Sequence, residues 1–175
     1  MVAAGLAPDL STPDLRPTDA HRRAWDVAAA VADPEIPVLT LADLGVLRRV
    51  DVAADGAVRV EITPTYSGCP AMDVIAQDLR AALADAGFAA IEIVTVLAPA
   101  WTTDWMSDAG REKLRAYGIA PPARGACGAG ADAPPACPRC ASPRTERISQ
   151  FGATACQALW RCLDCREPFD HFKCH

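Results

Sequence analysis

The chain has 175 residues, of which 51% are hydrophobic and eight are cysteine, and its net charge is −5 at pH 7. A length of this order suits one ordinary domain, or one domain followed by a small module. The negative charge argues against a general nucleic-acid binder, because phosphate contacts require clustered Lys and Arg side chains.

The sequence contains neither an export signal nor a membrane span. Residues 1–19 lack a basic start followed by an apolar run of signal-peptide length. No stretch reaches the roughly 18 apolar residues that a transmembrane helix needs. We therefore expect a cytoplasmic protein, in which Cys-x-x-Cys pairs indicate metal or redox sites rather than structural disulfides.

The N-terminal part begins with an arm and a helix. Prolines interrupt residues 1–17, which show no hydrophobic periodicity, so we expect this arm to be disordered. A helix is predicted from about Thr18 to Ala32, with Thr18 as its N-cap. The Asp33-Pro34 pair ends it, because the residue before a proline disfavours the helical conformation.

A β-hairpin is predicted next. Residues 46–52 have strand composition, Asp55-Gly56 marks a tight turn, and residues 58–63 alternate between apolar and polar side chains. The clearest helix follows over about residues 70–86, where a proline begins the first turn and Gly87 ends the helix. Residues 91–97 form a third strand that is apolar enough to be central in the sheet.

A final helix is predicted from its cap at Ser107 to Tyr117. The order α-β-β-α-β-α over residues 18–117 indicates a small α+β domain with helices on one face of a three-stranded sheet. In residues 118–136, 15 of 19 positions are Gly, Pro or Ala, which is typical of an interdomain linker. Residues 137–175 then form a separate module.

The module contains two Cys-x-x-Cys pairs, Cys137/Cys140 and Cys162/Cys165. This spacing lets each pair form a knuckle with both sulfurs facing one ion, and two knuckles complete a tetrahedron. The segment between them suits a β-hairpin, so we predict a zinc β-ribbon. Iron or an iron–sulfur cluster is the alternative for the same four thiolates, and a thiol redox role is the other.

Three more cysteines have no clear assignment. Cys156 and Cys174 lie near the module's four ligands in sequence and are candidates for a second, weaker metal site. Alternatively, Cys156 is an ordinary hairpin residue and Cys174 belongs to a frayed chain end. No role follows for Cys127 in the linker.

A different candidate site lies in the first domain. Cys69 directly precedes the helix at Pro70, where the helix dipole is expected to lower the pKa of its thiol. Asp33, Glu35 and Asp43 lie in loops that can reach the same end of the sheet. Carboxylates and one thiolate can hold iron transiently, although the same residues also suit ordinary turns or a small core position.

Several motifs occur together in the order of a known family. They are Asp33-Pro-Glu-Ile-Pro37, Asp43-Leu-Gly45, Thr63-Pro-Thr-Tyr-Ser-Gly-Cys-Pro70 and Pro99-Ala-Trp101, followed by Cys156 and its neighbours in the tail. On these motifs the chain resembles the iron–sulfur assembly family that contains SufT and PaaD. The tail resembles the PaaD-like branch specifically.

The resemblance implies an accessory protein for phenylacetyl-CoA epoxidase, the multicomponent oxygenase of aerobic phenylacetate degradation. It implies maturation or assembly of metal centres, with no turnover reaction of its own, and a cargo of transient iron or an iron–sulfur cluster. Cys69 would be the reactive cysteine, with Asp33, Glu35 and Asp43 around it. Expected partners are subunits of the epoxidase or the iron–sulfur assembly machinery, without nucleic acid or membrane.

Two alternatives to this role stay open. One is a stoichiometric structural subunit of the oxygenase complex. The other is a general iron–sulfur carrier or a zinc-ribbon interaction module.

Overall fold

The computed structural model describes residues 18–125 and 133–174, so the expected arm, Cys127 and His175 lie outside the described residues. Residues 18–117 contain four α-helices, three strands and a 3-10 turn. These elements are α1 (Asp19–Ala30), α2 (Leu41–Leu44), β1 (Leu47–Val52), β2 (Val58–Ile62), α3 (Ala71–Asp85), β3 (Ile91–Thr95), η1 (Thr103–Trp105) and α4 (Asp108–Tyr117).

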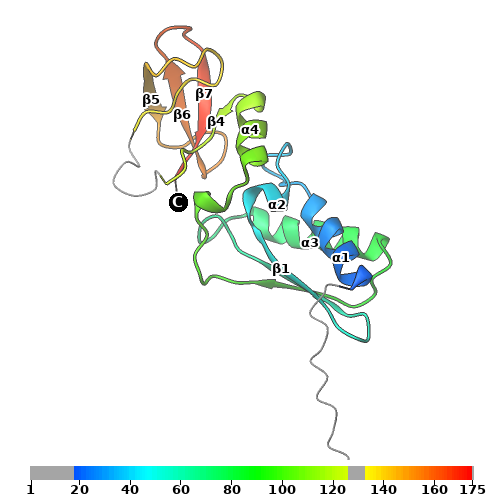
Figure 1. The fold of residues 1–175 in the computed structure, drawn as a ribbon. Helices are drawn as coiled ribbons and strands as arrows, with labels where there is room; N and C mark the ends of the chain where they lie inside the picture. The colour runs from blue at the N-terminus through cyan, green and yellow to red at the C-terminus, as the bar shows by residue number, and fades with distance from the viewer. Residues whose placement is uncertain (1–17, 126–132, 175) are drawn as a thin grey trace, which may run out of the picture.

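The first sheet confirms the predicted α+β class. β1 and β2 form the expected antiparallel hairpin, and β3 pairs parallel with β2. The helices α1 and α3 lie together on one face of this sheet (Figure 1). Parallel pairing follows from the α3 crossover, which returns the chain to the same end of the sheet before β3 begins.

The expected central place of the third strand is wrong. The strand order is β1-β2-β3, so β2 is central and β3 is an edge strand. The apolar side chains of Ile91 and Ile93 are instead explained by packing against the core on the helical face. A solvent-facing edge leaves every residue of β3 at least partly exposed.

The predicted helix caps are confirmed. The Thr18 side chain accepts a hydrogen bond from the His21 N–H at 3.2 Å, and the Ser107 side chain accepts one from the Gly110 N–H at 2.9 Å. Gly118 ends α4 in the left-handed conformation, with φ of 98°. Such caps satisfy N–H and C=O groups that a helix leaves unpaired at its ends.

The sequence does not predict the short helix α2, because four residues show no hydrophobic period. A reciprocal capping box between Thr40 and Asp43 forms it. Gly45 then ends it with φ of 71°, and a Cβ atom at Gly45 would lie 2.6 Å from the Trp105 carbonyl oxygen. Only glycine suits this position without displacing η1.

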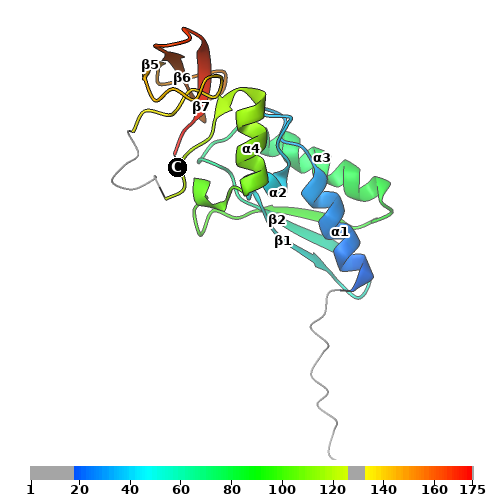
Figure 2. The same cartoon turned by 45° about the horizontal axis from the view of Figure 1, so that its top comes forward.

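The second sheet has four strands, in the order β4-β7-β6-β5. They are β4 (Ile119–Ala120), β5 (Thr145–Ser149), β6 (Gln157–Cys162) and β7 (Pro168–Phe172). The expected linker 118–136 therefore begins with a strand, because Ile119 pairs with Asp170 in a parallel ladder. Figure 2 shows the chain passing from α4 into this sheet.

The two sheets share buried side chains. Phe172 and Cys156 from the ribbon belong to the core of the first domain, where the Phe172 and Trp101 rings lie 6.1 Å apart. A smaller core inside the ribbon includes Trp160 and Phe169. These aromatic side chains are therefore core residues.

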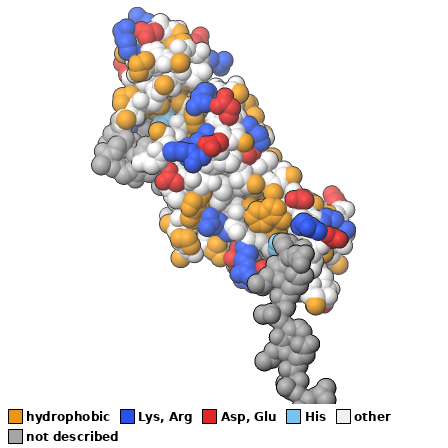
Figure 3. Space-filling view, viewed as in Figure 1, with side chains coloured by type: hydrophobic (Ala, Val, Ile, Leu, Met, Phe, Trp, Pro, Cys, Tyr) orange, Lys and Arg blue, Asp and Glu red, His pale blue; other side chains and the backbone are white. Residues whose placement is uncertain are grey.

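The surface is mixed in charge on the face that Figure 3 shows, where Lys and Arg alternate with Asp and Glu. The longest helix within residues 18–125 and 133–174 is α3, and none of the helices there has the length and apolar character to cross a bilayer.

Candidate functional site

The four cysteines of the ribbon meet at one point. Their sulfur atoms all lie within 4.8 Å of one another. The Cys137 and Cys165 sulfurs are 3.8 Å apart, and those of Cys140 and Cys162 are 3.6 Å apart. Sulfurs around a tetrahedral zinc with bonds of about 2.3 Å are separated by about 3.8 Å. The donor set and its spacing therefore fit one tetrahedral ion.

The two knuckles have the same backbone geometry. Ala141 and Arg166 each follow the second cysteine of a pair, and both adopt the left-handed conformation, with φ of 60° and 68°. A non-glycine residue in this conformation costs about 1 kcal/mol or more. The repeated strain at equivalent positions indicates that the turns are shaped by the requirement to aim both sulfurs inward.

Main-chain N–H groups favour the thiolate form of Cys162 in the second knuckle. The N–H groups of Cys165 and then Asp164 donate to Cys162 and lower the pKa of its thiol to about 6. The Ser142 hydroxyl donates to Asp164, and Arg144 forms an ion pair with Asp164 at 2.8 Å. These contacts join the first knuckle to the second and hold the sulfurs in register.

A second candidate site surrounds Cys69. The thiol lies at the N-terminal end of α3 and faces a small cavity of about 10 Å³. Asp33 and Glu35 line the cavity from the loop after α1, while the remaining lining is mostly apolar. The structure thus brings together three of the four residues expected at this site.

The Asp33 carboxylate is buried and partly paired. Its Oδ1 atom accepts hydrogen bonds from the N–H groups of Glu35 at 2.9 Å and Ile36 at 2.7 Å. Burial raises the pKa of Asp33, and burial together with the charge of Asp33 raises the pKa of Glu35. A bound cation would relieve both effects, because it stabilises ionised carboxylates.

The pKa of the Cys69 thiol differs from the sequence-based expectation. Burial raises the pKa of Cys69, and this effect exceeds that of the Ala71 N–H, which donates to the sulfur and favours the thiolate. The position at a helix start is as predicted, but the expected lowering of the pKa is wrong. Cys69 is therefore a protonated thiol near neutral pH.

Asp43 lies elsewhere in the fold and does not line the Cys69 cavity. Its carboxylate accepts hydrogen bonds from Lys113 at 2.6 Å and from the Ser107 hydroxyl at 3.1 Å. It also forms the capping box of α2 with Thr40. In this arrangement Asp43 joins α2 to α4.

The structure separates Cys156 from Cys174, which the sequence predicts as a pair. Cys156 lines the Cys69 cavity, whereas Cys174 lines two other cavities. No local sequence signal indicates the approach of Cys156 to Cys69, because it depends on how the ribbon packs against the first domain.

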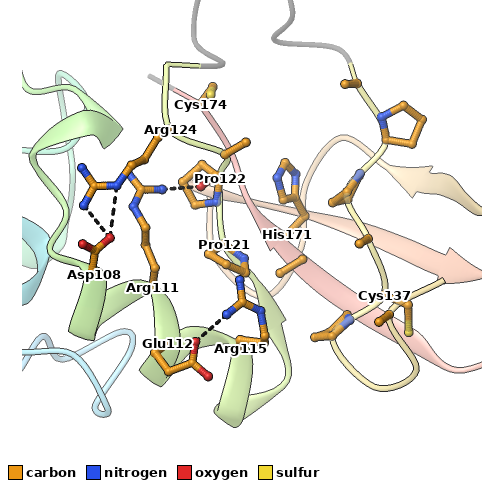
Figure 4. Close-up of a pocket in the computed structure, with 18 residues that line it drawn as sticks. Asp108, Arg111, Glu112, Arg115, Pro121, Pro122, Arg124, Cys137, His171 and Cys174 are labelled. Carbon is orange, nitrogen blue, oxygen red and sulfur yellow. Dashed lines mark hydrogen bonds and ion pairs between the residues drawn. The ribbon is translucent and has the colours of Figure 1, made fainter. Parts of the chain in front are cut away.

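A larger cavity, of about 600 Å³, lies between α4 and the ribbon (Figure 4). Its arginines already have partners within the described chain. Arg111 donates to the carbonyl oxygens of Thr103 and Pro122, while Arg115 pairs with Glu112 and Arg124 with Asp108. We assign no ligand to this cavity, because its charges are matched locally.

Two family models match the two halves of the chain. Residues 23–96 match the model described as iron-sulfur cluster assembly protein. Residues 122–173 match the model described as PaaD zinc beta ribbon domain. The first match contains the whole three-stranded sheet, and the second contains β5, β6 and β7 but not β4.

A relative matches nearly the whole chain. A protein from Escherichia coli K12, described as one of the subunits of 1,2-phenylacetyl-CoA epoxidase, is 50% identical over 160 residues, which cover 91% of this chain and 96% of the relative. A Porphyromonas gingivalis protein, described as an Fe-S protein maturation auxiliary factor, is 43% identical over 79 residues. That match covers 45% of this chain and 74% of the relative.

A solved structure supports the fold of the first domain. It is a domain of unknown function from Bacillus anthracis, with a TM-score of 0.51 and 25% sequence identity. The match covers 54% of this chain and 91% of that structure.

Proposed function

Because this chain belongs to the PaaD family, we propose that it is an accessory protein that supplies or protects iron, or an iron–sulfur cluster, during maturation of a phenylacetyl-CoA epoxidase. Its own role is binding and transfer of the cargo, without a turnover reaction. The observation that carries this proposal is the cavity at Cys69, Asp33 and Glu35, which lies in the part of the chain that matches the iron–sulfur assembly model.

The chemistry of the Cys69 cavity suits a cargo that must leave again. The thiol is protonated near neutral pH, because burial raises its pKa. An arriving metal ion displaces this proton and gains a thiolate ligand, with the carboxylates of Asp33 and Glu35 close by. Protonation of the sulfur favours the reverse step, so the cargo is held labilely.

We propose zinc for the four cysteines of the ribbon. Thiolate ligands in a closed tetrahedron favour zinc, and an ion with all four positions filled by protein is structural. The ion would fix β5, β6 and β7 and thereby the ribbon surface that packs against the first domain.

The test is a Cys69→Ser variant co-expressed with the epoxidase subunits. We expect activity and iron content of the purified oxygenase to fall by roughly 10-fold or more, since loss of groups that merely support a metal ligand already costs 10–100-fold. Unchanged zinc content and thermal unfolding of the variant show that it is folded. A matched control is Ser67→Ala, two residues away in the same loop, which should leave the oxygenase unchanged. Full oxygenase activity with Cys69→Ser would contradict the proposal.

A second candidate is a stoichiometric structural subunit of the oxygenase, which is favoured by the description of the Escherichia coli relative as an epoxidase subunit. Omission of this chain distinguishes the two functions. A structural subunit co-purifies at a fixed ratio, and its omission breaks the complex while each remaining subunit keeps its metal. A maturation protein leaves the complex, and its omission yields an assembled oxygenase that lacks metal.

A further inference from the structure

The cavity beside Cys69 contains a second thiol from the other end of the chain. Cys156 lies in the loop between β5 and β6, is 4% exposed, and lines this cavity together with Asp33 and Glu35. The charges of both carboxylates act on Cys69 and on Cys156. Four side chains that can bind a metal, from two domains, therefore line one small cavity. Among the described residues only the four ribbon cysteines already hold their ligand atoms within 4.8 Å of one another, so binding at the Cys69 cavity requires its side chains to turn towards the ion.

The loop that places Cys156 is held on both sides. The Cys156 carbonyl oxygen accepts a hydrogen bond from the Lys173 N–H at 2.9 Å, directly after β7. At the start of the loop, Gly152 packs so closely on Asp170 of β7 that a Cβ atom would lie 2.2 Å from its Oδ1. Because Phe172 at the end of β7 is buried in the first domain, the thiol is fixed relative to Cys69.

We propose that Cys69 and Cys156 together bind one divalent transition-metal ion, with Asp33 and Glu35 supplying oxygen ligands. Thiolate and carboxylate donors in one site suit ions of intermediate softness, such as Fe²⁺. The inference rests on the proposed function only for the identification of this ion as the iron that the protein delivers. The first domain alone supplies one sulfur, and the ribbon supplies the other.

The size of the cavity determines the kind of cargo. Its volume of about 10 Å³ corresponds to about one water-sized sphere. A cavity of this size accommodates a single ion, whereas an iron–sulfur cluster requires a larger space than the one described. The site in this arrangement is therefore a mononuclear site.

Binding releases protons in a fixed ratio. Each of the two thiols loses one proton as its sulfur bonds to the ion, so one M²⁺ replaces two H⁺ and no electrons are exchanged. Both thiols start protonated, because burial raises the pKa of Cys69 and raises that of Cys156 to about 11. Apparent affinity then rises by up to about 100-fold per pH unit in the neutral range, as two released protons require.

The experiment uses the full-length protein, purified with its zinc and titrated anaerobically with Co²⁺ at pH 8. We expect one cobalt per chain in addition to one zinc, with a near-ultraviolet charge-transfer band from two sulfur–cobalt bonds. Cys69→Ser and Cys156→Ser should each halve the band per bound cobalt and weaken binding by roughly 100-fold. The reason is that a direct ligand matters at least as much as its supporting groups.

The matched control is Gln150→Ala, a change in an exposed ribbon residue that lines another cavity. It should leave the cobalt band and affinity unchanged. Zinc content and circular dichroism of each variant establish that the ribbon is folded, and Cys156→Ala serves if a buried serine unfolds the loop. The proposal is overturned if the wild type takes up no second ion, if folded Cys156→Ser and Cys156→Ala keep the full band, or if the band does not depend on Cys69.

The two proposals fail in different ways. A cobalt site that requires both thiols, in variants that still mature the oxygenase fully, supports the site and contradicts the proposed function. An oxygenase that requires Cys69 while folded Cys156→Ser binds cobalt normally contradicts the two-thiol site and leaves the proposed function standing.

Discussion

At the scale of single residues, burial raises the pKa of two thiols outside the four-cysteine cluster of the ribbon, Cys69 and Cys156. Cys69 receives a hydrogen bond from the Ala71 N–H, yet burial raises the pKa of its thiol. Cys156 is more deeply enclosed, and burial raises its pKa to about 11. Neither thiol is an activated nucleophile at neutral pH, and both become good ligands when a cation replaces their protons.

The raised pKa values predict slow alkylation of both thiols at the Cys69 cavity in metal-free protein. A raised pKa keeps less thiolate at pH 8 than a free cysteine has, so iodoacetamide should modify Cys69 more slowly than glutathione. Cys156, with a pKa of about 11, should react at least about 10-fold more slowly than glutathione. Rates should increase towards pH 11. Mass spectrometry of peptides after timed labelling measures each site, with urea-unfolded protein as the control. Labelling of native Cys156 at the free-thiol rate would contradict its burial.

The raised pKa of Cys156 also makes the stability of the fold depend on pH. A thiol with a raised pKa stabilises the fold while it is protonated, and this contribution is lost as the pH rises from about 9 towards 11.

At the scale of elements, the short helix α2 depends on one carboxylate. Burial by itself would raise the pKa of Asp43, but hydrogen bonds from Lys113, Thr40 and Ser107 lower it. The same bonds connect α2 to α4, whose Gly110 packs with its Cα against Asp43. A helix of four residues has little stability of its own, so its position follows from these contacts.

Replacement of this carboxylate should destabilise the first domain. The Asp43 side chain is only 10% exposed, and Asp43→Asn removes its ion pair with Lys113. We expect a loss of about 1–3 kcal/mol in the free energy of unfolding, because the partly buried donors Thr40 and Ser107 and the Lys113 ammonium lose a charged acceptor. Chemical denaturation measures it. The control Asp51→Asn breaks the exposed pair with Arg49 and should cost under about 0.5 kcal/mol. Equal losses in both variants would contradict the assigned role of Asp43.

At the scale of the whole molecule, the ribbon and the first domain stabilise each other. The ribbon contributes Phe172 and Cys156 to the core of the first domain, while its own core is small. A module of this size needs a further source of stability, and a structural zinc site supplies about 10 kcal/mol of apparent binding free energy.

Removal of the proposed zinc ion should therefore unfold the ribbon and loosen its contact with the first domain. After strong chelation we expect amide protons of β5, β6 and β7 to exchange rapidly, while those of β1 and β2 stay protected. The Trp101 fluorescence should change as the Phe172 ring moves away from the Trp101 ring. Amide hydrogen exchange measured by mass spectrometry follows both halves, and restored protection after zinc addition is the control. Protected ribbon amides in metal-free protein would contradict this dependence.

Features that depend on residues close together in the chain could be predicted from the sequence, and features that depend on distant contacts could not. Helix caps at Thr18 and Ser107 and the Cys-x-x-Cys pairs depend on residues a few positions apart, and the structure confirms their geometry. The edge position of β3, the strand β4 and the meeting of Cys156 with Cys69 depend on contacts between distant segments. The expected pKa of Cys69 is wrong for that reason, because its burial involves residues far away in the chain.

Because β4 pairs with β7, the ribbon begins earlier in the chain than its first cysteine. Ile119 and Ala120 follow α4 directly, yet they lie in the ribbon's sheet beside Asp170 and His171. A fragment cut just before Cys137, as the cysteine spacing suggests, would strip this neighbour from β7 and leave its main-chain donors and acceptors open to other molecules. An expression fragment of the ribbon must therefore retain Ile119. A fragment of the first domain that ends after β4 would contain this strand without its partner β7.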